Sequence, residues 1–219
     1  MTMNNAELIK QLESLYSAVV CDVLDALGYP KQSLSTEFRP LTPAKRLAGR
    51  IFTARAHVVT EVPAEPYKLE IEAVDRLESG DVFVVSADAD RTCGFWGELL
   101  TTACQYKNVN GVLMDACTRD LWKINEMNFP IFGIGYHPAD SKGRVDIFEL
   151  QIPIELGSVS ITPGDYVIGD EDGVVIIPQK VAAEAVKLAL EKVSGENIAR
   201  ADLAAGVPMG EVFRKYGIL

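Results

Sequence analysis

Two short segments carry side chains that could bind a small organic anion and a divalent cation together. The first, Gly94 to Leu100, is a glycine-containing loop that leads into an expected helix. The first backbone N–H groups of a helix lack partners within the helix, and the helix dipole favours negative charge there. This loop could therefore bind a carboxylate or phosphate, with Gly97 allowing close approach. An ordinary turn between a strand and a helix is the plainer interpretation.

The second segment, Asp115 to Asp120, follows a short apolar stretch that is typical of a buried strand. Ligands of parallel α/β sheets bind just beyond the carboxyl ends of the strands. Arg119 offers a planar fork that suits a carboxylate, and Asp120 offers hard oxygens that suit Mg²⁺ or Mn²⁺. The alternative is structural. Thr118 would cap a helix, and the negative charge of Asp120 would only interact favourably with the N-terminal end of the helix dipole.

The two segments follow successive predicted strands, so they should meet at one edge of the sheet. Twenty residues separate Glu98 from Arg119, about the length of one helix followed by one strand. An anion-binding loop, a guanidinium and two carboxylates would then converge. This set of groups could bind an oxo acid together with a divalent cation.

The elements that must position these groups alternate along the middle of the chain. Strands are expected over 49–60, 82–86, 111–115 and 129–134, and helices over 66–77, 98–106 and 118–126. Such alternation predicts parallel strands joined by crossover helices. Residues 31–48 indicate a connector. Short strands over 152–161, 166–168 and 174–177, separated by turn signals, indicate antiparallel or mixed pairing.

The two ends of the chain are expected to be helical. Residues 4–28 predict two helices that end near Gly28 and Pro30, with Ser17 as a cap of the second. Residues 179–194 predict an amphipathic helix, followed by two short helices split at 206–208. We therefore expect one domain over residues 1–219, with an α/β core over about 40–178 and a helical C-terminus over 179–219.

Composition excludes several classes of protein. The chain has 219 residues and a net charge of −10, which disfavours nonspecific nucleic-acid binding. Its four cysteines form no C-x-x-C pair, so a structural zinc site is not expected. Residues 1–11 lack the apolar core of a signal peptide, and no apolar run approaches the ~20 residues of a membrane helix. These features predict a cytoplasmic protein with no membrane partner.

The sequence resembles the RraA-like family, which includes class II 4-hydroxy-4-methyl-2-oxoglutarate and 4-carboxy-4-hydroxy-2-oxoadipate aldolases. The family pattern G-x3-[D/E]-x20-R-D is matched by Gly94, Glu98 and Arg119-Asp120. The resemblance covers roughly residues 15–180. It extends through segments 21–28, 40–41, 49–50, 163–165 and 170–175.

The resemblance implies a role for each matched position. The backbone of Gly97, Glu98, Leu99 and Leu100 would bind a pyruvate carboxylate, and Arg119 would bind the oxo-acid oxygen and steady the enolate. Asp120 would ligate Mg²⁺ or Mn²⁺ directly. Glu98 would hold water on the metal, one molecule of which would act as base. Family members also contribute acidic residues across a subunit contact, for which the candidates here are Glu191 and Glu196.

Other polar residues have plainer interpretations. His57 lies within a strand and is expected to be structural, whereas His137 follows a strand end and could reach the site. Lys142 and Arg144 could bind a distal acid group, although a solvated loop is the simpler interpretation. Asp170 and Asp172 could belong to a metal-binding loop, but their spacing indicates a hairpin turn instead. Cys93 and Cys117 could act as nucleophiles, but neither has an obvious histidine partner.

The resemblance implies an α/β fold of the swivelling β/β/α type, with mixed sheets flanked by helices. It implies a metal-dependent aldolase that releases pyruvate from a 4-hydroxy-2-oxo acid and decarboxylates oxaloacetate as a side activity. It also implies a homotrimer or a dimer of trimers with sites between subunits. Two alternatives remain open: a non-catalytic regulator that binds an RNA-degrading enzyme, and a sugar-acid pathway lyase.

Overall fold

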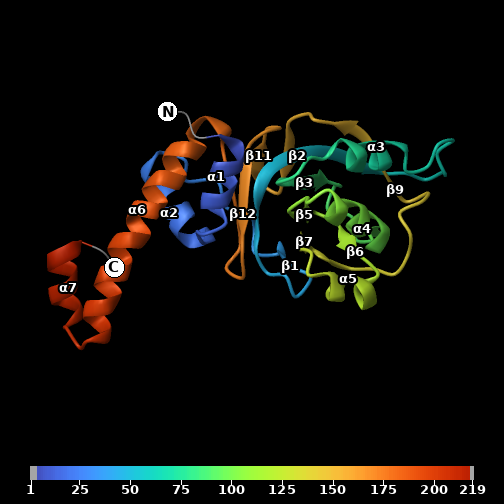
Figure 1. Cartoon of the computed structure of the whole chain (residues 1–219). Coiled ribbons are helices and arrows are strands. Elements are labelled where there is room, and N and C mark those ends of the chain that lie inside the picture. The colour runs from blue at the N-terminus through green and yellow to red at the C-terminus, as the bar shows by residue number, and fades with distance from the viewer. Residues whose placement is uncertain (1–3, 218–219) are drawn as a thin grey trace.

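The computed structural model describes residues 4–217 and contains a curled mixed sheet flanked by helices (Figure 1). The main sheet has the order β1-β7-β5-β3-β2-β12-β13, with β9 also paired to β2. This architecture confirms the predicted α/β class. The strands are β1 (Arg39–Pro40), β7 (Ile131–Gly133), β5 (Gly111–Met114), β3 (Asp81–Ser86), β2 (Leu47–Val58), β12 (Tyr166–Gly169), β13 (Val174–Ile177) and β9 (Val145–Leu150).

The centre of the sheet is parallel, as the alternating sequence pattern predicts. Strands β2, β3, β5 and β7 pair in parallel, and helices α3 (Lys68–Arg76), α4 (Glu98–Tyr106) and α5 (Leu121–Met127) follow β2, β3 and β5 in turn. Residues 82–85 of β3 are fully buried because helices or other strands cover both faces. The carboxyl ends of these strands therefore share one edge.

A second, three-stranded sheet lies just beyond the parallel strand ends. It consists of β4 (Gly94–Trp96), β6 (Cys117–Thr118) and β8 (Gly135–Tyr136), all parallel. The sequence predicts a loop from Gly94 to the start of α4 and a helix cap at Thr118, but the structure has strands β4 and β6 at these positions. Thr118 belongs to β6, and its hydroxyl donates to the carbonyl of Trp96 at 2.9 Å. Strands this short leave no periodic signal in the sequence.

The antiparallel part also departs from prediction in two places. The single strand expected over 152–161 is a hairpin of β10 (Ile154–Leu156) and β11 (Val159–Ile161), because Gly157 adopts a φ of +60° between them. Strand β9 pairs with β2 in a region for which no strand is predicted. The turn between β12 and β13 is the predicted hairpin, closed by Asp170 N–H donating to the carbonyl of Gly173 at 3.0 Å.

Helices from both ends of the chain pack together on one side of the sheet. Helices α1 (Asn5–Leu12), α2 (Ser17–Ala26) and α6 (Gln179–Ala204) form a core with β12 and β13 that buries side chains such as Leu12, Leu24 and Ile177. Ser17 does not cap α2 as predicted. It is the first helical residue, and its amide and hydroxyl donate to the Asp170 carboxylate at 2.7 and 2.6 Å.

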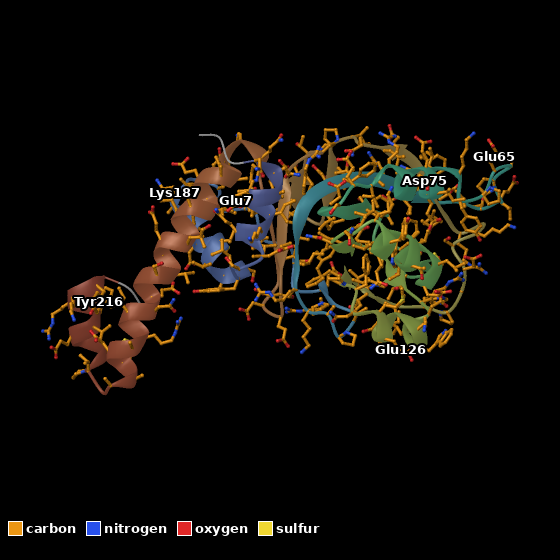
Figure 2. The ribbon with its side chains drawn as sticks, in the orientation of Figure 1. Glu7, Glu65, Asp75, Glu126, Lys187 and Tyr216 are labelled. Atoms are coloured by element: carbon orange, nitrogen blue, oxygen red, sulfur yellow. The ribbon has the colours of Figure 1, made fainter. Side chains whose placement is uncertain are left out.

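The C-terminal helices differ from the prediction. Helix α6 continues through Ser194 to Ala204 and extends away from the sheet, so the predicted end at 194 is wrong (Figure 1). One helix, α7 (Met209–Tyr216), follows the break at Gly206, whose φ is +87°. Figure 2 shows Tyr216 at one end of the molecule and Glu65, in the loop before α3, at the opposite end. The last two residues of the predicted helical C-terminus, 218–219, lie outside the described range.

None of the helices described between residues 4 and 217 combines the length and the apolar character that crossing a bilayer requires.

Candidate active site

The two segments whose side chains could bind an anion and a cation line one cavity of about 500 Å³, through Gly94, Gly97, Glu98, Leu99, Leu100, Arg119 and Asp120. It lies beside the small sheet, where the carboxyl ends of the parallel strands point. A volume of this size suits a metabolite, since ligand pockets commonly measure about 300–1,000 Å³. The lining residues are Tyr67, Glu70, Ile71, Gly94, Phe95, Gly97, Glu98, Leu99, Leu100, Arg119, Asp120, Trp122, Asp140 and Ser141.

The backbone around Arg119 and Asp120 is fixed by the small sheet. Arg119 N–H donates to the carbonyl of Trp96 at 2.8 Å, which joins this segment to β4. Asp120 is the residue that precedes α5 and adopts a left-handed conformation with φ 60° and ψ 30°. Aspartate tolerates this region better than most residues. The conformation turns the chain sharply between β6 and α5, directly at the cavity.

Gly97 brings the two segments into direct contact. A Cβ atom at this position would lie 2.7 Å from Asp120 Oδ2, which is closer than the Cβ atoms of real side chains approach other atoms. Glu98 N–H donates to the same oxygen at 3.2 Å. The amides of Leu99 and Leu100 follow in the first turn of α4, whose N-cap residue, Gly97, has no side chain to accept them. These two amides have no partner within the helix, so they are available to an anion.

Two carboxylates hold the Arg119 guanidinium across the cavity. Its Nη1 lies 3.3 Å from Asp140 Oδ1, and its Nε lies 3.6 Å from Asp120 Oδ2. Asp140 also accepts a hydrogen bond from the Tyr67 hydroxyl. About a third of the Arg119 side chain is exposed, so the fork still faces the cavity. The guanidinium is thus oriented before any substrate arrives.

Glu70 is a lining residue that the sequence reasoning missed. It is 5% exposed, and burial, reinforced by the charges of Asp146 and Asp140, raises its pKa to about 8. A signal was present: Glu70 precedes Ala73, Val74 and Leu77 by three, four and seven positions, and all three are buried. That spacing places Glu70 on the inward face of α3.

Tyr67 and Asp140 were also missed. Burial and the hydrogen bond to Asp140 raise the pKa of Tyr67 to about 12, so its hydroxyl stays protonated. Both residues lie in irregular segments, and no sequence pattern brings them together.

The carboxylates of Glu98 and Asp120 could hold a divalent cation. Both line the cavity, and within residues 4–217 the Glu98 carboxylate receives a single hydrogen bond, from the Thr102 hydroxyl at 3.4 Å. Among residues 4–217, no three His, Cys, Asp or Glu side chains lie close enough together to hold a metal ion alone. Mg²⁺ commonly binds through one or two carboxylates and keeps several waters, so the donor set fits Mg²⁺ or Mn²⁺ rather than zinc.

The two histidines lie outside the lining of the cavity. His137 N–H donates to the carbonyl of Thr118 at 3.0 Å, and its Nδ1 accepts the amide of Ala139 at 3.1 Å, so the ring serves its own loop. His57 lies on β2 and pairs with Asp88 at 2.8 Å. The structure therefore favours a structural role for both.

The basic and acidic candidates also lie elsewhere. Arg144 Nη1 donates to the backbone carbonyl of Asp140 at 2.9 Å, and neither it nor Lys142 lines the cavity. Glu196 accepts a hydrogen bond from Tyr16, and exposed Glu191 lies 3.9 Å from Lys187. Both glutamates belong to α6, so they do not reach the cavity of their own chain.

The cysteines near the site are buried rather than reactive. Burial raises the pKa of Cys93 to about 12 and raises the pKa of Cys117 as well. A thiolate is the nucleophilic form of cysteine, so neither thiol is activated.

Comparison with known proteins gives a consistent picture. The sequence model of the RraA-like family, described as Aldolase/RraA, matches residues 17–176. "Putative 4-hydroxy-4-methyl-2-oxoglutarate aldolase" of Halalkalibacterium halodurans is 30% identical over 179 residues, which cover 81% of this chain and 80% of that protein. "Protein DlpA" of Legionella pneumophila is 27% identical over 98% of this chain but only 34% of its own, so the chain spans about a third of that protein.

A solved structure has the same fold. It is Streptomyces coelicolor RraAS2, described as an unusual member of the RNase ES inhibitor RraA protein family. The TM-score is 0.78 at 26% identity, and the match covers 91% of this chain and 98% of the other.

Proposed function

This chain belongs to the RraA-like family, and we propose that it is a divalent-metal-dependent class II aldolase that cleaves a 4-hydroxy-2-oxo acid to pyruvate. At the level of the family, the names of its relatives support a lyase of the aldolase type. One observation carries the specific proposal. Arg119, Asp120, Glu98 and the first turn of α4 line the same cavity.

The pyruvate end of the substrate fits the α4 side of the cavity. Its carboxylate would accept hydrogen bonds from the amides of Leu99 and Leu100, where the helix dipole further stabilises a negative charge. The Arg119 guanidinium would then donate to the C2 oxygen. Asp140 holds this guanidinium at 3.3 Å and so limits the reorganisation needed when charge develops on that oxygen.

Cleavage to pyruvate requires two proton transfers and the breaking of one carbon–carbon bond. The C4 hydroxyl loses its proton, the C3–C4 bond breaks, and C4 leaves as a carbonyl group. The electron pair passes to the pyruvate enolate, whose negative oxygen Arg119 stabilises, and C3 then takes up a proton. Glu98 faces the cavity, where it can orient water and accept the C4 hydroxyl proton through it.

The residues that would hold a metal are Asp120, by direct ligation, and Glu98, through water. A bound divalent cation supplies Lewis acidity at the C2 oxygen and lowers the pKa of nearby water. The same enolate would form if C4 left as CO₂. Oxaloacetate decarboxylation is therefore the expected side activity.

We also propose a homotrimer or a dimer of trimers with sites between subunits. Leu99 and Trp122 at the cavity are 77% and 76% exposed, which is unusual for such large apolar side chains in a monomer. A neighbouring subunit at this rim would cover them. Glu191 or Glu196 of that neighbour could then approach the site.

A non-catalytic regulator of an RNA-degrading enzyme is the second candidate, and the likeness to RraAS2 favours it. That role does not require a guanidinium between two carboxylates in a metabolite-sized cavity. The retained Arg119, Asp120 and Glu98 therefore favour catalysis.

The test measures pyruvate release from oxaloacetate and from 4-hydroxy-4-methyl-2-oxoglutarate, with Mg²⁺ and with EDTA. We expect turnover with Mg²⁺ and its loss both in EDTA and in Asp120→Ala. Asp172→Ala, in the exposed β12–β13 turn, is the matched control and should behave as wild type. No turnover of either substrate with metal would refute the aldolase. Undiminished turnover in EDTA would instead refute the metal dependence and the role of Asp120 as a metal ligand.

A further inference from the structure

One side of the cavity differs from the pyruvate-binding side. It is formed by Tyr67 and Glu70, from the start of α3, and by Asp140 and Ser141, from the loop before β9. We call these four residues the acidic wall. Tyr67 and Asp140 are joined by a hydrogen bond, and Glu70 is buried.

The charges around the cavity are unbalanced. Its lining contains the carboxyl groups of Glu70, Glu98, Asp120 and Asp140, against one cationic side chain, Arg119. In the proposed function, Glu98 and Asp120 serve the metal, and Arg119 serves the pyruvate end. Among the described lining residues, the acidic wall then shares its one cation, Arg119, which lies 3.3 Å from Asp140, with the pyruvate end. The nearby Arg144 uses its Nη1 on the backbone carbonyl of Asp140.

From this arrangement we propose that the acidic wall selects a substrate whose tail beyond C4 is uncharged and bears hydroxyl groups. The substrate class is then a 2-oxo-3-deoxy sugar acid rather than a dicarboxylate aldol. The proposal rests on the proposed function, because the tail is defined by a pyruvate end bound at α4 and Arg119.

The chemistry of the wall matches hydroxyl groups. A second carboxylate would lie beside the Asp140 carboxylate, whose ion-pair partner Arg119 already serves the pyruvate end, so the added negative charge is unfavourable in a partly buried site. A hydroxyl group can both donate and accept, so it can pair with the Asp140 carboxylate and with the Tyr67 and Ser141 hydroxyls. Because Glu70 is largely protonated near neutral pH, its carboxyl group can also donate. The cavity of about 500 Å³ leaves room for a six-carbon acid.

The experiment separates the tail from the pyruvate chemistry. Exchange of the pyruvate methyl protons in D₂O with Mg²⁺, followed by NMR, needs no tail and tests the proposed function alone. The tail is tested by comparing kcat/KM for 2-oxo-3-deoxygluconate and for 4-hydroxy-2-oxoglutarate. Calorimetry in EDTA gives the Kd of both acids without turnover.

We expect kcat/KM to favour the hydroxylated acid by about 30-fold or more, as two lost hydrogen bonds of about 1 kcal/mol each would give. Kd should show the same order. Equal or better cleavage and binding of 4-hydroxy-2-oxoglutarate, with methyl exchange intact, would overturn the proposal and leave the proposed function standing. If exchange and cleavage are both absent, the two Kd values still test the selectivity of the acidic wall, because the hydroxylated acid must bind more tightly than 4-hydroxy-2-oxoglutarate.

Variants of the wall give an independent readout. Glu70→Leu should lower the ratio of hydroxylated-acid cleavage to pyruvate exchange about tenfold, because the leucine neither donates nor accepts. Glu70→Gln should keep this ratio within about threefold, because an amide does both. Tyr67→Phe provides a second test should Glu70→Leu not fold. The control is Glu72→Gln, on the half-exposed face of the same helix. An unchanged ratio in both Glu70→Leu and Tyr67→Phe would overturn the proposal.

Discussion

Gly97→Ala tests the geometry that joins the two halves of the site. The added Cβ would lie 2.7 Å from Asp120 Oδ2, whereas ordinary contacts begin at 3.4 Å, so the oxygen must move by about 0.7 Å. The Glu98 N–H bond to this oxygen, 3.2 Å long, would then break or distort. Gly97 has a φ of −137°, which alanine adopts freely, so the backbone itself is not strained.

The magnitude follows from that one hydrogen bond. Bonds to charged groups contribute about 1.5–3 kcal/mol, which corresponds to a loss of about 10- to 150-fold in kcat/KM for oxaloacetate. Mn²⁺ affinity, measured by calorimetry, should fall in the same variant because Asp120 moves. The melting temperature should change little.

Gly210→Ala is the matched control, since a Cβ at Gly210 in α7 meets no atom within 4 Å. It should keep wild-type activity and metal affinity. Wild-type kcat/KM and Mn²⁺ affinity in Gly97→Ala would refute the reasoning, because the clash would then have no consequence at Asp120. A large drop in melting temperature would show that Gly97 serves the fold instead.

Three further predictions concern charge and burial. Arg119→Lys should lower kcat/KM about 100-fold or more, because a point charge cannot replace the planar fork; full retention in a steady-state assay would contradict that role. Glu70 is protonated in the folded protein up to its pKa of about 8, whereas in the unfolded chain it ionises above its ordinary pKa of 4.5. The free energy of unfolding should therefore fall between pH 5 and 8 by about 3–5 kcal/mol relative to Glu70→Gln, as urea titrations would measure; parallel pH profiles would exclude a buried acid. Iodoacetamide should alkylate half-buried Cys21 first in the native protein, as mass spectrometry would show, while early modification of buried Cys93 would contradict its burial.

The central sheet could be predicted because its strands and helices each leave a clear pattern. Residues 82–85 form an unbroken apolar run, and the helices between strands have amphipathic spacing. The positions of Glu98, Arg119 and Asp120 at one cavity follow from that alternation, since parallel strands end at the same edge.

The missed features are those whose cause is tertiary. Strands β4, β6 and β8 have two or three residues each and exist because the neighbouring strands align them. Helix α6 passes through Ser194 and Gly195, because its other contacts outweigh the roughly 1 kcal/mol that a glycine costs in a helix. Asp140 reaches Arg119 from a loop, and no local pattern indicates such a contact.

The long strand β2 has a consequence for how the protein is made. It pairs with β3, which follows soon after in the sequence, but also with β9 and β12. Strand β9 begins about 90 residues after the end of β2, and β12 follows β9. At a synthesis rate of about 5–20 residues per second, the nascent chain carries an unpaired β2 edge for roughly 5 to 20 seconds. During that interval the apolar strand is open to wrong partners, so yield in a cell should depend on chaperones that bind the unfinished chain.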